Sequence, residues 1–237
     1  MPLKPLFRRA RVMFRQMVGR EPVLWPTTRL KLEFCGTEYG GWPIVQGSLS
    51  RDAVVVDMGL GEDLSFSEAL IEKYGCTVYG FDPTPKSIEY VRRRNPPRFS
   101  LFELGVSASG GDGVLHLPND PAHVSGSLYA SQHLGRDKIQ VKLIEIARVP
   151  ETIGTTRIDL LKMDIEGAEF EVIDAPGFAD TVANTGQICV EFHHRWERFG
   201  KDKTEHAVRR LDELGFEIAW VSSSNEEVLF VRRSTFV

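Results

Sequence analysis

Hydrophobic and polar positions follow two alternating patterns from residue 53 onward. Short runs of β-branched and other apolar residues, typical of buried strands, are followed by segments with the three- and four-residue apolar spacing of helices. Strands are predicted over 53–58, 77–82, 100–108, 158–164 and 187–194. Helices are predicted over 65–75, 84–94, 166–175 and 203–215. This alternation predicts the α/β class, with a mostly parallel sheet covered by helices on both faces.

Three segments depart from this alternation. Residues 27–34 alternate like a strand that precedes the α/β region. Residues 109–137 are rich in turn formers and predict a hairpin arm with a long loop. Residues 216–222 and 226–233 predict an antiparallel pair of strands at the end of the α/β region.

The first 26 residues differ in composition from the rest, so we divide the chain into an extension over 1–26 and a domain over 27–237. Residues 1–20 hold six Lys or Arg and no acid, so the remainder sums to −10 within a net charge of −4. On a helix, one face is apolar and another basic. The apolar face holds Leu6, Phe7, Ala10, Met13, Phe14 and Met17, and the basic face holds Arg8, Arg11 and Arg15.

Several roles fit this basic amphipathic helix. It suits peripheral binding to an acidic membrane surface, or self-association with a second subunit. It also resembles an organelle transit peptide, being rich in Arg and free of acids. The simplest alternative is a terminal helix that packs its apolar face on its own acidic domain.

The composition predicts an ordinary globular protein with a sizeable core, since 42% of the residues are hydrophobic and 26% are charged. No apolar run approaches the roughly 20 residues of a membrane span. Cys35, Cys76 and Cys189 are odd in number and scattered, which excludes a disulfide framework or a zinc cluster. Reduced cysteines favour a cytoplasmic location.

The stretch "VVVDMGLGED", residues 54–63, predicts a buried strand that ends in a tight glycine loop. Asp57, Gly59 and Gly61 follow the strand, and Asp82 ends the next strand, where a carboxylate suits the two ribose hydroxyls of a nucleotide-like ligand. A pyrophosphate avoids nearby anions. S-adenosylmethionine (SAM) has no phosphate and carries a cationic sulfonium and ammonium. A loop edged by Asp57 and Glu62, with Asp63 beside them, therefore favours SAM over NAD.

Four segments in order resemble the motifs of class I SAM-dependent methyltransferases, and more narrowly those of the FkbM-type family. They are "VVVDMGLGED", "VYGFDPTP", "IDLLKMDIEGAEFEVI" and "ICVEFHH". The resemblance covers about residues 36–232. It implies a Rossmann-like sheet of seven strands with the last one antiparallel. It also implies O-methylation, with Asp57, Gly59 and Gly61 lining the methionine part of SAM and Asp82 holding the ribose.

Methyl transfer to a hydroxyl requires alignment of the acceptor oxygen and removal of its proton. Asp164 follows one predicted strand, while Glu191 and His193 share one face of the next. We expect these three to form the catalytic cluster, with His193 as general base. The same three could bind a divalent cation. Their spacing is not that of a dedicated metal site, so a metal is not favoured.

The acceptor is expected among loop residues that suit a sugar or another polyhydroxylated compound. The substrate-binding candidates are Tyr39, Trp42, His123, Tyr129 and His194. The expected function is SAM-dependent O-methylation of a sugar or small natural product. Nucleic acid is disfavoured as a partner because the body of the chain is acidic. The alternatives are an NAD-dependent oxidoreductase and a non-catalytic SAM-fold interaction module.

Overall fold

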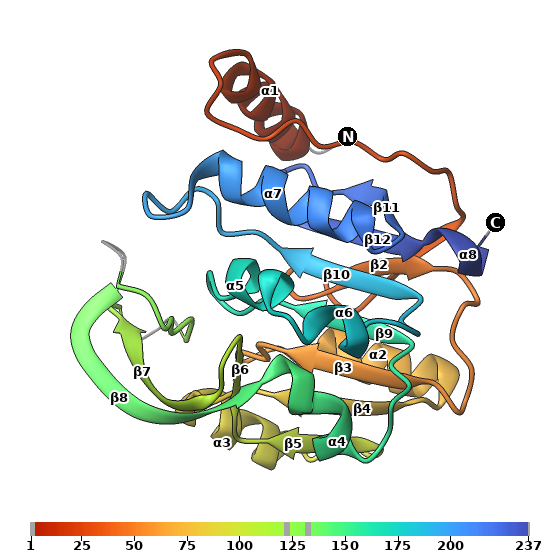
Figure 1. Ribbon diagram of the computed structural model, residues 1–237, viewed down its shortest axis with the longest axis vertical. Helices are drawn as coiled ribbons and strands as arrows, with labels where there is room; N and C mark the ends of the chain where they lie inside the picture. The colour runs from red at the N-terminus through yellow and green to blue at the C-terminus, as the bar shows by residue number, and fades with distance from the viewer. Residues whose placement is uncertain (1–2, 121–123, 131–133, 237) are drawn as a thin grey trace.

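A computed structural model describes residues 3–120, 124–130 and 134–236, and it contains a central sheet of seven strands (Figure 1). The strand order is β11-β12-β10-β9-β3-β4-β5. Only β12 runs antiparallel to its neighbours. The strands are β3 (Val54–Met58), β4 (Thr77–Phe81), β5 (Phe99–Phe102), β9 (Leu160–Met163), β10 (Gln187–Glu191), β11 (Phe216–Val221) and β12 (Glu227–Arg232). The predicted α/β class with a mostly parallel sheet is confirmed.

Side chains alternate between the two faces of the sheet, and each face has its own core. Val56 and Met58 of β3 belong to one core, which contains Phe170, Phe178 and other residues of the helices on that side. Those helices are α5 (Glu169–Asp174), α6 (Phe178–Thr181) and α7 (Gly200–Glu213), with α4 (Val149–Ile153) and the 3-10 turn η1 (Ile146–Arg148). Val55 belongs to the opposite core, under α2 (Ser65–Tyr74) and the hairpin of β1 (Leu32–Cys35) and β2 (Trp42–Val45).

Local signals placed the ends of the helices well. Gly75 ends α2 in the left-handed conformation at φ 67°, as its position after the helix predicts. Pro85 opens α3 (Pro85–Arg94) in its first turn. The segment 36–44 is rich in glycine, which is typical of a loop, but its last residues form β2 and pair with β1. The segment 100–108 was predicted as one strand. It instead forms parts of two strands that belong to different sheets.

That division creates a small second sheet, which projects from the body as a curved arm (Figure 1). It consists of β6 (Gly105–Ser107), β8 (Leu134–Glu145) and β7 (Gly111–Pro118), in that order. The expected hairpin arm corresponds to β7 and β8, which are antiparallel. An antiparallel bridge between His116 and Ser127 folds the described part of the long loop back against β7.

The basic helix α1 (Leu3–Met17) lies at one end of the molecule, beyond α7 and β11 (Figure 1). The expectation that it packs its apolar face on the domain is wrong, because Phe7, Met13, Phe14 and Met17 are exposed. The short helix α8 (Arg233–Phe236) follows β12. Among the described residues, no helix has the length and hydrophobicity to cross a membrane.

One buried ion pair joins the two central strands at the point where strand order reverses. The Lys162 Nζ of β9 donates to Oδ1 of Asp57 in β3 at 3.0 Å and to the Gly59 carbonyl at 2.8 Å. The Ser67 hydroxyl of α2 donates to the other Asp57 oxygen at 2.7 Å. Burial alone would lower the pKa of Lys162, but the carboxylates of Asp57 and Asp164 outweigh it and raise that pKa. The pair therefore fixes the start of the glycine loop.

We expect Asp57→Ala to lower the free energy of unfolding by about 3–5 kcal/mol, because it leaves a buried ammonium without its partner. Urea denaturation measures the loss. Asp112→Ala is the control, since Asp112 is paired with Lys142 at an exposed site and such a pair contributes about 0–1 kcal/mol. The double variant Asp57→Leu/Lys162→Met should recover much of the loss. Equal losses in Asp57→Ala and Asp112→Ala would contradict the assignment.

Candidate functional site

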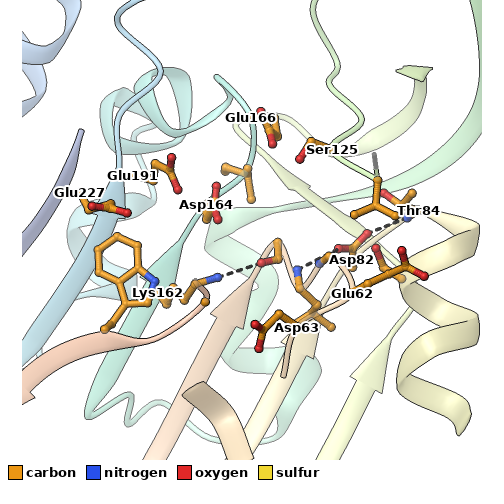
Figure 2. Close-up of a pocket in the computed structure, with 18 of the residues that line it drawn as sticks. Glu62, Asp63, Asp82, Thr84, Ser125, Lys162, Asp164, Glu166, Glu191 and Glu227 are labelled. Atoms are coloured by element: carbon orange, nitrogen blue, oxygen red, sulfur yellow. Dashed lines mark hydrogen bonds between the residues drawn. The ribbon is translucent and has the colours of Figure 1, made fainter. Parts of the chain in front are cut away.

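A cavity of 890 Å³ opens at the carboxyl ends of β3, β4, β9 and β10, where ligands of open α/β sheets bind (Figure 2). Its volume lies in the range of small-molecule sites. Most of the residues predicted from sequence contribute to its wall. They are Tyr39, Trp42, Gly59, Gly61, Glu62, Asp82, Asp164 and Glu191.

The glycine loop needs both of its glycines, for different reasons. Gly59 has φ 83°, and a Cβ there would lie 1.7 Å from the Asp164 carbonyl oxygen. The end of β3 thus touches the residue after β9, and only a missing side chain permits it. Gly61 has φ 56°, but a Cβ there would meet nothing closer than Val124 at 3.8 Å. Its backbone therefore borders open space in which a ligand can approach.

Asp82 holds the loop in shape. Its Oδ2 accepts hydrogen bonds from the backbone N–H groups of Leu60 at 2.8 Å and Gly61 at 3.1 Å. Its Oδ1 accepts one from Thr84 at 2.8 Å (Figure 2). A carboxylate has about four acceptor sites, so Asp82 retains capacity for a ligand hydroxyl. Its role in the structure is therefore wider than the ribose contact expected from sequence.

Asp57 differs from its expected position against the ligand. Its carboxylate is 3% exposed, is absent from the cavity wall and faces Lys162 and Ser67. It supports the loop from beneath because strand alternation turns it toward the core under α2. Lys162 was not among the site residues predicted from sequence, yet it contacts Asp57 and contributes to the cavity wall.

Asp164 and Glu191 form a carboxylate pair at the ends of β9 and β10. Figure 2 shows both side chains on the same side of the cavity. Burial, reinforced by the nearby Glu166, raises the pKa of Asp164 to about 6 although Lys162 opposes the shift. The charge of Asp164, followed by burial, raises the pKa of Glu191 well above its usual range. Close carboxylates resist simultaneous ionisation, so the pair holds a proton near neutral pH.

His193 is held between two other carboxylates. Its Nδ1 lies 2.8 Å from Glu169 Oε1 and its Nε2 lies 3.1 Å from Glu166 Oε2. Burial alone would lower the pKa of His193, but Glu169 and Glu166 raise it well above its usual range. Both ring nitrogens therefore face carboxylates, and His193 is absent from the cavity wall. This corrects the expectation that His193 is the general base.

Glu169, the first residue of α5, holds the inner nitrogen of the His193 ring. It is fully buried, and its other oxygen accepts the Gly167 N–H at 2.9 Å. Glu166 instead reaches the cavity, and hydrogen bonds from His193 and Ser125 lower its pKa against the effect of burial. His193 therefore contacts a cavity-lining carboxylate and does not itself line the cavity.

The residues weighed as metal ligands do lie together. Asp164, Glu191 and His193 each have one potential ligand atom within 4.8 Å of the others. A metal on His193 would have to displace Glu166 or Glu169 from a ring nitrogen. Asp164 and Glu191 face the cavity, whereas both nitrogens of His193 are engaged. The geometry therefore favours proton binding by the two carboxylates over metal binding by all three residues.

The predicted acceptor residues separate into two groups. Trp42 is buried in the cavity wall, and Tyr39 stands at its opening with 89% of its surface exposed. Tyr129 lies outside this cavity, where its ring packs edge-on against Phe199 at 5.4 Å. His123 lies outside the described residues.

His194 is also away from the cavity, which corrects its assignment to the acceptor. Its side chain is buried, with Nε2 3.4 Å from Glu21 Oε1. His194 lies in the turn beyond the end of β10, where the chain has already left the strand that carries Glu191. His194 therefore helps to hold the segment that follows α1.

Several residues of the cavity wall were not predicted from the sequence. Segments far apart in the chain bring them together, so local patterns do not mark most of them. They include Arg8, Glu38, Ser125, Lys162, Glu166, Trp220, Ser222 and Glu227. A lysine inside the apolar strand "LLKM" is the one local signal that was available, since buried strands are normally apolar. The others belong to loops and strand ends that only the fold brings together.

The charge of the cavity fits a cationic ligand. Its acidic residues are Glu38, Glu62, Asp63, Asp82, Asp164, Glu166, Glu191 and Glu227, and its basic residues are Arg8 and Lys162. Eight acids and two bases give a formal charge of −6. At an effective dielectric near 20, one carboxylate about 4 Å from a phosphate costs about 4 kcal/mol. The open glycine loop and this acidic wall therefore suit SAM and oppose a pyrophosphate.

We expect Gly59→Ala to abolish SAM binding measured by calorimetric titration, because the added Cβ forces β3 away from Asp164. Gly61→Ala is the matched control in the same loop, with positive φ but free space. Its strain of about 1–2 kcal/mol should weaken binding by at most about thirtyfold. Similar affinities for the two variants would show that the close approach at Gly59 is not required.

Residues 52–218 match the Methyltransferase FkbM domain. The chain is 26% identical over 162 residues to the probable methyltransferase-like protein 24 of Rattus norvegicus, covering 68% of this chain and 39% of that protein. It is 26% identical over 156 residues to the 2-O-methyltransferase NoeI of Sinorhizobium fredii (strain NBRC 101917 / NGR234), covering 60% of this chain and 63% of NoeI. This chain thus spans about two fifths of the first relative and less than two thirds of the second.

Among solved structures, the Aeropyrum pernix fibrillarin in complex with natively bound S-adenosyl-L-methionine is similar with a TM-score of 0.42 and 11% sequence identity. That similarity covers 86% of this chain and 84% of the fibrillarin chain. The FkbM match extends over well more than half of the sequence and includes the glycine loop and both strand ends that bear the carboxylate pair. The chain belongs to the FkbM family of methyltransferases, whose methyl donor is SAM.

Proposed function

We propose that the protein transfers the methyl group of SAM to a hydroxyl of a sugar or small natural product. The observation that carries this proposal is the carboxylate pair of Asp164 and Glu191, which faces the same cavity as the glycine loop. A hydroxyl must lose its proton during methylation, and such a pair can accept one. The name of the relative NoeI, a 2-O-methyltransferase, supports oxygen as the acceptor atom. Membership of a methyltransferase family argues against the alternative that the protein is an NAD-dependent oxidoreductase.

The glycine loop and its surroundings would hold the donor. The backbone of Gly59 and Gly61 borders the cavity, and Asp82 has acceptor capacity for the ribose hydroxyls. Glu62 adds negative charge beside the loop, which attracts the cationic groups of SAM. SAM supplies an electrophilic methyl on a sulfonium. The protein contributes alignment and a proton acceptor, both of which its own side chains provide.

We assign the proton taken from the acceptor to the carboxylate oxygens of Asp164, whose pKa burial and the nearby Glu166 raise to about 6. A base with a pKa near the working pH is the most effective one. His193 acts as a positioning residue. Its ring nitrogen Nε2 contacts Glu166 and holds that carboxylate at the cavity.

The acceptor would enter past Tyr39 and lie against Trp42 and Ser125, which offer a flat ring and a hydroxyl. Polyanions such as nucleic acids are disfavoured because the cavity is acidic. We place the protein in the cytoplasm, supported by three cysteines that are all free and buried.

The first experiment is a screen for transfer of the radiolabelled methyl of SAM to sugars, glycosides and phenolic or polyketide alcohols. Formation of S-adenosylhomocysteine together with labelled product supports the proposal. Binding of SAM without turnover on every acceptor would support the non-catalytic module instead. A chelator such as EDTA should leave the rate unchanged, and restoration of a lost rate by Mg²⁺ would establish the metal alternative.

With an acceptor in hand, we expect Asp164→Asn to lower kcat by about 10²–10⁴-fold while the affinity for SAM stays within about fivefold. Asp174→Asn, on α5 outside the cavity, is the matched control and should retain activity. Steady-state kinetics separates the two effects. Unchanged kcat in Asp164→Asn would remove Asp164 from the mechanism.

The pH profile tests the same residue. The base must be deprotonated, so kcat/KM of the wild-type enzyme for SAM should rise with pH through about 6, the pKa of Asp164 in the free enzyme. Below that value the rate should fall about tenfold per pH unit. The residual activity of Asp164→Asn should lose this acidic limb. An acidic limb that persists in Asp164→Asn would assign the titration to another group.

A further inference from the structure

The orientation of α1 is the reverse of what an ordinary surface helix shows. Phe7, Met13, Phe14 and Met17 are between 60% and 78% exposed. Positions 7, 10, 14 and 17 follow the spacing of one helix face, and Met13 lies beside it. A large apolar face open to water is unfavourable and marks a surface for another partner.

The contacts that hold α1 come from its other face. Val12 is buried, the Arg15 guanidinium lies 3.2 Å from Glu21, and the Gln16 amide donates to the Pro22 carbonyl at 3.0 Å. These contacts fold the chain after α1 back along the helix. The domain therefore supports α1 by its polar side and leaves its apolar side outward.

Glu21 connects this assembly to the domain. It is 1% exposed, and Arg195 donates to its Oε1 at 2.5 Å. Burial alone would raise the pKa of Glu21, but His194 and Arg195 lower it to about 2. Glu21 therefore ties the segment that follows α1 to the residues after β10.

Charge decides between the partners that an apolar face can accept. Residues 1–20 carry six basic residues and no acid. Arg9 and Arg11 are exposed and flank the apolar face on its two sides. Pairing two copies of α1 would bring these arginines together, whereas an anionic lipid surface attracts them.

We propose that α1 is a membrane-surface helix that binds anionic lipid headgroups through its arginines and inserts Phe7, Phe14 and Met17 among the upper acyl chains. Arg8 of the same helix contributes to the wall of the cavity. Membrane binding thus sets the cavity opening beside the bilayer. This inference is independent of the methyl acceptor, because its test measures binding rather than turnover.

Co-sedimentation of the full chain with lipid vesicles tests the proposal. The wild-type protein should sediment with vesicles of phosphatidylcholine containing phosphatidylglycerol, bind pure phosphatidylcholine at least tenfold more weakly, and dissociate as salt is raised. Phe14→Glu/Met17→Glu should lose binding. Arg9→Gln/Arg11→Gln should weaken it by about fivefold for each arginine removed.

Arg93→Gln/Arg148→Gln is the matched control, because both arginines are exposed and lie on other elements. It should bind as the wild type does. Calorimetric titration with SAM should give the wild-type affinity for all variants, which shows that the domain is folded. Wild-type protein that stays in the supernatant with anionic vesicles at low salt would overturn the proposal. A dimer in analytical ultracentrifugation that Phe14→Glu/Met17→Glu dissociates, without vesicle binding, would overturn it in favour of a second copy.

Discussion

The buried contact between Lys162 and Asp57 is the constraint on which the site depends. It joins the two strands that flank the reversal of strand order, and the same ammonium holds the Gly59 carbonyl. An ion pair in the core is costly to desolvate, so its value lies in geometry rather than in net stability. With β3 and β9 fixed to each other, Gly59 is pressed against Asp164, and the glycine loop and the carboxylate pair acquire a defined separation.

The carboxylates around the Lys162–Asp57 contact differ in burial and in the groups they bind. Asp57 and Glu169 are buried beneath it and hold a lysine and a histidine. Asp82 shapes the loop through backbone N–H groups. Asp164 and Glu191 face the cavity with raised pKa values. Carboxylates thus differ in what they do in the structure: some support the loop, some shape it and some line the cavity, and burial and neighbouring charges set the pKa of each.

The N-terminal helix adds a second level of organisation to this arrangement. It attaches through its polar face to Glu21, which His194 and Arg195 hold from the end of β10. The residues just after Glu191 and His193 therefore hold the segment that carries α1. The end of β10 therefore contributes Glu191 to the cavity wall, and the residues just after it bind Glu21, which follows α1.

The sequence by itself determined the α/β class, the glycine loop, the acidic character of the cavity and the position of Asp164 and Glu191 at neighbouring strand ends. These follow from local periodicity, glycine spacing and strand-end position, which are short-range properties. Only the tertiary structure decided that His193 is engaged on both nitrogens, that Asp57 faces the core, and that α1 turns its apolar face outward. Each of these depends on partners elsewhere in the chain: Lys162 for Asp57, Glu166 and Glu169 for His193, and Arg195 for the segment that follows α1. A pattern along the chain gives the face on which a side chain lies, but its protonation and role depend on what packs against that face.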